Sequence, residues 1–107
     1  MQIERVDCTP HEDVYHPGEV INIAIYFRKP FVGQCEVGLV HKEHAFGSDF
    51  RRTTFARSSN NLYEGQLYIR DSQVGRCILL ARLAPVKGSA QIVAAGDQIF
   101  EVRPLRP

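Results

Sequence analysis

The chain has 107 residues, of which 44% are hydrophobic and 23% charged, and its formal net charge at pH 7 is +1. A chain of this length fits one domain and can bury enough surface to fold without a metal or a disulfide. The near-zero charge excludes a general attraction to nucleic acid or membranes, so electrostatic binding must come from local clusters of charge.

Targeting and redox signals point to the cell interior. No apolar stretch approaches the roughly 20 residues of a membrane-spanning helix, and the N-terminal residues lack the apolar region of a signal peptide. Three cysteines, an odd number, fit a reducing compartment better than a secreted disulfide framework. We expect a cytoplasmic protein in which residues 1–107 form a single domain, and we expect that domain to be part of a longer protein.

Alternation of apolar and polar residues is the main structural pattern. Ile21, Ile23, Ile25 and Phe27 occupy every second position of one run, which places one face of a strand in a core. Similar runs predict strands over residues 2–8, 19–28, 34–42, 51–56, 62–70, 76–84 and 91–103. Because turn residues separate them, the pattern predicts an all-β fold, an immunoglobulin-like antiparallel β-sandwich of about seven strands.

Irregularities in this pattern can be placed in chain order. Ile3 and Val6 have opposite parity, which predicts a bulge or a switch between sheets in the first strand. A loop over residues 9–18 ends in a Pro-Gly turn. Pro30 cannot donate a backbone hydrogen bond, so the second strand must end before it. Gly96-Asp97 predicts a bulge or a turn inside the last strand.

The cysteines are predicted to be structural. Parity places Cys35 in the third strand and Cys77 in the sixth strand toward the core, where free thiols act as small apolar groups. Cys8, at the end of the first strand, is expected to be more exposed. The inward parity argues against a Cys–His nucleophile pair, and no glycine-rich phosphate loop is present. We therefore predict no enzyme activity and no cofactor.

The immunoglobulin-like topology would gather basic residues at one end of the domain. There the loops after the second, fourth and sixth strands meet, and they contain no Asp or Glu. Phe31 lies there between Pro30 and Val32 and is predicted to be an apolar anchor for a partner. The candidate partner-binding residues are Arg28, Lys29, Phe31, Arg57 and Lys87. Such a surface suits an acidic protein or, through anionic head groups, a membrane. In the alternative, Phe31 and Val32 fold back over the core and the cations are solvated.

The opposite end is rich in histidine and acidic residues. Imidazole and carboxylate groups suit zinc or a similar divalent ion, so a metal site is an alternative hypothesis. Its candidate ligands are His11, His16, His41 and His44. Their spacing matches no established zinc signature, and the competing interpretation is solvated or hydrogen-bonded histidines at loop ends.

Edge strands offer a further mode of association. Arg51 and Arg52, with Phe50, Phe55 and Arg57 nearby, give a basic strand with aromatic residues. Such a strand can stack nucleic acid bases but is more typical of an edge strand protected by charge. We predict no nucleic acid binding. An unpaired edge, at residues 51–56 or 91–103, can accept a strand from a partner or from a second copy, and downstream chain is another route to a homo-oligomer.

Short motifs resemble those of SKICH domains, which are single-sandwich modules of coiled-coil adaptors and some phosphoinositide phosphatases. The similar segments are Tyr15-His16-Pro17-Gly18, Val37-Gly38-Leu39, Gly75 and Phe100-Glu101-Val102. The resemblance runs over about residues 3–103. It implies a non-catalytic module for protein contact or membrane localisation, followed by further chain, with no catalytic residues.

These observations together predict a non-catalytic protein-interaction or targeting module of an adaptor or scaffold protein. The alternatives are a ligand- or metal-binding sandwich that uses the histidine-rich end and a structural domain that associates with itself.

Overall fold

The computed structural model describes residues 3–41, 53–86, 88 and 91–104, without the side chains of 72 and 91–98. Within these residues the fold consists of strands and one short 3-10 helix. The elements are β1 (Ile3–Thr9), β2 (Val14–Tyr15), β3 (Val20–Phe27), β4 (Gly33–His41), β5 (Thr53–Ser59), β6 (Leu62–Tyr68), η2 (Asp71–Gln73), β7 (Gly75–Pro85) and β8 (Gln91–Val102). The predicted all-β class is confirmed.

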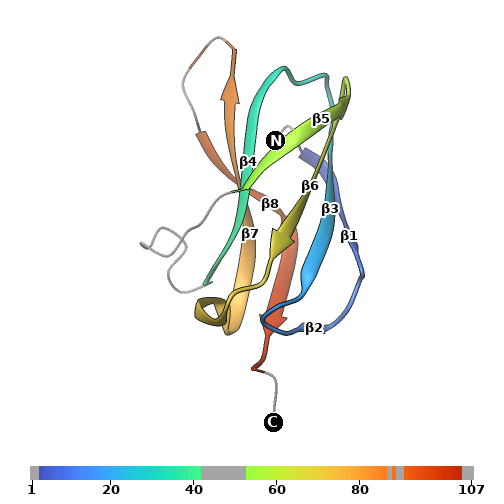
Figure 1. The fold of residues 1–107 in the computed structure, drawn as a ribbon. Helices are drawn as coiled ribbons and strands as arrows, with labels where there is room; N and C mark the ends of the chain where they lie inside the picture. The colour runs from blue at the N-terminus through green and yellow to red at the C-terminus, as the bar shows by residue number, and fades with distance from the viewer. Residues whose placement is uncertain (1–2, 42–52, 87, 89–90, 105–107) are drawn as a thin grey trace.

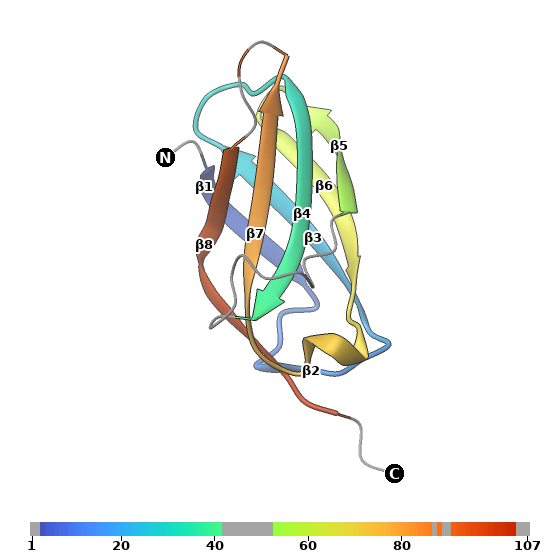
Figure 2. The same cartoon turned by 90° about the vertical axis from the view of Figure 1, so that its left-hand side faces the viewer.

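The strands form two layers that are joined along one side (Figures 1 and 2). The first sheet pairs β1, β3 and β6, and the second pairs β4, β7 and β8, all antiparallel. Between them, β5 pairs with β4 through Thr53–Phe55 and with β6 through Ala56–Ser59. The strand order β1-β3-β6-β5-β4-β7-β8-β2 is that of an immunoglobulin-like sandwich.

The core lies between the two sheets and follows the predicted parity. Ile21, Ile23, Ile25 and Phe27 of β3 are at most 2% exposed. On the other strands the inward residues that the alternation predicted are also buried: Cys35, Val37, Leu39, Leu67, Ile69, Cys77, Leu79, Ala81 and Leu83. Burying these side chains removes apolar surface from water, which is the main favourable contribution to folding.

The two predicted irregularities are present. In β1 the pairing with β3 shifts between Ile3 and Arg5, and this bulge restores the inward parity of Val6 and Cys8. Cys8 is therefore buried, and the expectation that it would be more exposed is wrong. In the β7–β8 ladder, Ile78 pairs with Ile99 and Leu80 with Ala94, so the irregularity spans Gly96-Asp97.

The fourth strand differs from its prediction. An edge strand was predicted over residues 51–56, but β5 covers Thr53–Ser59 and pairs with one sheet through each half. It lies within the strand order because it crosses from one layer to the other, so it does not present a continuous unpaired edge. Arg51 and Arg52 lie outside the described residues. The short strand β2, which pairs in parallel with the end of β8, was not predicted.

Backbone hydrogen bonds confirm the predicted grouping for the loops that the structure describes, whereas the loop over residues 43–50 lies outside the described residues. At one end Gly18 N–H donates to the carbonyl of Ile69, which joins the loops before β3 and after β6. At the other end Phe31 N–H donates to Asn60, and Val86 N–H donates to Val32. The loops after β3, β5 and β7 thus meet at the end where the basic residues were predicted to gather.

Candidate functional site at the basic loop end

Buried aromatic rings hold the loop between β3 and β4. Phe31 is only 6% exposed and stacks on Phe27, with ring centroids 5.1 Å apart. Both rings also contact Tyr63 of β6, at 5.6 and 5.4 Å. The predicted role of Phe31 as an exposed anchor is therefore wrong. The loop covers this end of the core, because the inward ring of Phe31 excludes water from the side chains beneath it.

Polar contacts fix the backbone of the same loop. The hydroxyl of Tyr63 lies 3.1 Å from the carbonyl oxygen of Phe31 and 3.0 Å from that of Gly33, and it donates to these acceptors. The N–H of Val86 donates to the carbonyl of Val32 across 3.3 Å. Because its backbone is held from several sides, this loop can present its outer side chains with little loss of entropy on binding.

Three of the predicted cations lie on this loop or beside it. Arg28 and Lys29 are exposed on it, and Arg57 of β5 is exposed beside it. The guanidinium of Arg57 donates to the side-chain oxygen of Asn60 across 2.9 Å, and Asn60 in turn accepts from the loop backbone. Lys87, the fourth predicted cation, lies outside the described residues.

Two valines complete the surface, and neither was predicted as a site residue. Val32 is 52% exposed and Val86 is 74% exposed. Val32 lies in the loop before β4, so no strand alternation could indicate its exposure from the sequence. We define the basic tip as Arg28, Lys29, Val32, Arg57 and Val86. It combines apolar contact area with positive charge on a fixed backbone.

The described histidines at the opposite end are not gathered into one site. A ring nitrogen of His16 donates to the carbonyl of Arg103 across 2.8 Å, and one of His41 donates to Val74 across 3.0 Å. His11 is exposed, and His44 lies outside the described residues. In the part of the chain that the structure describes, no three His, Cys, Asp or Glu residues form a group suited to a metal.

The thiols have structural surroundings. Burial raises the pKa of Cys35 to about 12 and, together with the Asp7 charge, that of Cys8 to about 11. Burial also raises the pKa of Cys77 to about 11, and its thiol donates to the carbonyl of Gln73. A thiol held protonated in this way is a poor nucleophile at neutral pH.

Comparisons with known proteins identify no family. No protein-family model and no curated protein matches the chain. One similar solved structure is the complex of Zinc 2-glycoprotein and Prolactin inducible protein from human seminal plasma, with 9% identity and a TM-score of 0.38. The match covers 95% of this chain and 97% of that one. Likeness at this level bears on neither function nor partner. Among the described residues there is no helix long and apolar enough to cross a membrane.

Proposed function

We propose that this chain is a non-catalytic interaction module that binds an acidic segment of a protein through the basic tip. The observation that carries this proposal is the exposed valine pair, Val32 and Val86, beside Arg28, Lys29 and Arg57 on a loop end whose backbone is fixed. Cations around an interface accelerate encounter with an acidic partner. The apolar side chains add surface that is removed from water when the partner binds, which stabilises the complex.

The composition of the tip favours an acidic protein over a nucleic acid or an anionic membrane. Binding to either polyanion depends on neutralising many phosphates with many cations. The described tip carries three cations, and the whole chain has a net charge of only +1. Three cations around two valines suit a short protein segment that alternates carboxylates with apolar side chains.

The proposed setting is a cytoplasmic adaptor or scaffold protein. No disulfide joins the three cysteines, all of which are buried, and this accords with a reducing compartment. The short SKICH-like motifs support the same class of module, although the proposal depends on the tip and not on them.

The first experiment is an NMR titration with a synthetic peptide that alternates Glu and Leu. We expect amide shifts to concentrate at residues 28, 29, 31, 32, 57–61 and 86. The variant Arg28→Gln/Lys29→Gln should bind the peptide at least tenfold more weakly, and Val32→Ser/Val86→Ser should also weaken binding. The control Arg70→Gln/Arg76→Gln removes the same charge from exposed residues at the opposite end, and it should bind as the wild type does.

Two results would contradict the proposal. One is a set of shifts that avoids the tip, and the other is an equal loss of affinity in the control variant, which would mean that total charge alone matters. After the titration, capture from a lysate of the native host with the same variants would identify the natural partner.

A further inference from the structure

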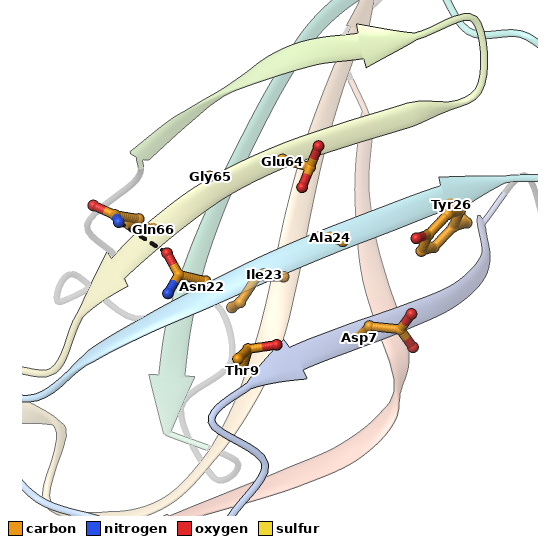
Figure 3. Close-up of a pocket in the computed structure, with 9 residues that line it drawn as sticks. All are labelled: Asp7, Thr9, Asn22, Ile23, Ala24, Tyr26, Glu64, Gly65 and Gln66. Atoms are coloured by element: carbon orange, nitrogen blue, oxygen red, sulfur yellow. Dashed lines mark hydrogen bonds between the residues drawn. The ribbon is translucent and has the colours of Figure 1, made fainter.

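A shallow hollow of about 410 Å³ lies on the outer face of the first sheet, over β1, β3 and β6 (Figure 3). Its floor is formed at Ala24, whose small side chain leaves a gap between longer neighbours. The register of the sheet places Asp7 on one side of Ala24 and Glu64 on the other. Because neighbouring strands lie about 4.8 Å apart, the backbones that carry these carboxylates are roughly 10 Å apart.

The walls of the hollow are polar. Asn22 and Gln66 form the next row of the sheet, and the amide of Gln66 donates to the side-chain oxygen of Asn22 across 2.8 Å. Both are exposed, as are Asp7 and Glu64. Two carboxylates across a gap, with amide groups beside them, favour a cationic side chain that can donate several hydrogen bonds.

An arginine of the chain itself already shows how this face binds a guanidinium. Arg5 places its guanidinium carbon 4.1 Å from the ring centroid of Tyr26, and its Nε lies 3.4 Å from a carboxylate oxygen of Asp7. The hydrogen bond to Tyr26 is the largest cause, and the charge of Asp7 the next, of a pKa of Arg5 above its ordinary value. Arg5 thus occupies one margin of the hollow, while the gap over Ala24 lies beside it.

We propose that the hollow receives the basic tip of a second copy of this chain, with Arg28 and Lys29 entering between Asp7 and Glu64. This inference rests on the proposed function and names the acidic partner of the tip. The reason for choosing a second copy is charge complementarity. One molecule carries an exposed group of cations at one end and, on a sheet face, a hollow flanked by Glu64 and by Asp7, whose carboxylate also pairs with Arg5. Because the two surfaces differ, the contact is heterologous and can join more than two molecules, in a closed ring or an open chain.

Analytical ultracentrifugation of the purified 107-residue protein tests this contact. We expect the average mass of the wild type to rise above 12.1 kDa with protein concentration, and the rise to shrink as salt screens the charges. The face variant Asp7→Asn/Glu64→Gln and the tip variant Arg28→Gln/Lys29→Gln should each associate at least tenfold more weakly. The control Glu12→Gln/Asp13→Asn removes two exposed carboxylates from another loop and should associate as the wild type does.

A mixture of the two variants gives the decisive result. The face variant keeps an intact tip and the tip variant keeps an intact hollow, so an equimolar mixture should form one-to-one dimers that grow no further. A wild type that stays monomeric at millimolar concentration, a face variant that associates as well as the wild type, or a mixture that stays monomeric overturns the inference. If the wild-type tip still binds the Glu-Leu peptide in that case, the proposed function stands and only the identity of the partner is wrong.

Discussion

Each end of the sandwich has a buried tyrosine whose hydroxyl donates to a loop carbonyl, Tyr63 at the basic tip and Tyr15 at the opposite end, and the two ends differ in the contacts that are added to it. At the basic tip, the loop after β3 is anchored from below by the packed rings of Phe27, Phe31 and Tyr63. At the opposite end, which we call the histidine end, side chains hold the loops by hydrogen bonds. His16 donates to Arg103 and His41 donates to Val74.

This difference decides which side chains are available to a partner. Anchoring by buried rings leaves the outward residues of the loop, Arg28, Lys29 and Val32, exposed. Anchoring by polar side chains uses the imidazoles themselves, since a ring nitrogen that donates to a carbonyl is engaged within the domain. The apolar anchor therefore leaves outward side chains exposed for the proposed contact, whereas the polar anchor engages two of the candidate metal ligands within the domain.

The largest expected effect separates Phe31 from its neighbour. Phe31→Ala should lower the free energy of unfolding by about 3–5 kcal/mol because it leaves a cavity beneath the tip. Val32→Ala removes an exposed side chain and should change it by less than about 0.5 kcal/mol. Urea unfolding of both variants measures the difference. Equal losses would mean that the ring does not anchor the loop.

Two glycines provide the next comparison, one from each end. A Cβ added at Gly33 would overlap the backbone carbonyl of Ala84 on the neighbouring strand, so Gly33→Ala should cost about 1–3 kcal/mol. Gly18, at the histidine end, has a φ of +95° and nothing within 4 Å of an added Cβ. Gly18→Ala should therefore lower the free energy of unfolding by about 1 kcal/mol, through the strained backbone conformation alone. In thermal unfolding, Gly33→Ala should have a lower melting temperature than Gly18→Ala. The reverse order would contradict the close contact at Gly33.

Alkaline pH should destabilise the fold through the buried thiol of Cys35. Burial raises the pKa of Cys35 from 9.0 to about 12, so the unfolded chain loses this proton at lower pH than the folded chain. The stability that Cys35 contributes is complete below pH 9 and is lost as the pH rises toward 12. With a pKa of 9.0 in the unfolded chain and about 12 in the folded chain, the loss from Cys35 at pH 10 should be about 1.4 kcal/mol. Unfolding at pH 7–10 should show a flatter pH dependence for Cys35→Ala, and a profile parallel to the wild type would refute the assignment.

The smallest effects should come from two tyrosine hydroxyls. Tyr63 donates to the loop of the basic tip, whereas Tyr15 donates to the carbonyl of Pro10 across 2.8 Å at the histidine end. Tyr63→Phe and Tyr15→Phe should each cost about 1 kcal/mol. Only Tyr63→Phe should speed amide exchange at Phe31 and weaken binding of the Glu-Leu peptide. If Tyr15→Phe weakened that binding as much, the loops would not be held independently.

Local patterns were enough to predict much of the fold. The period of two correctly assigned the inward faces of β3, β4 and β7, and the parity conflict between Ile3 and Val6 correctly located a bulge. The grouping of loops followed from the topology and was also correct. Three charged members of the candidate site, Arg28, Lys29 and Arg57, are exposed, and their binding to a partner stays a prediction.

The sequence by itself determined which residues face the core along each strand, because side chains alternate within a single strand whatever it pairs with. Only the tertiary structure decided the burial of Phe31, the crossing of β5 between layers and the hollow over Ala24. Each of these depends on contacts between distant positions. Phe31 turns inward because its ring packs on Phe27 and Tyr63. Asp7 and Glu64 flank Ala24 because the strand register brings residues 7, 24 and 64 into one row. No local period encodes a register, which is set where strands meet.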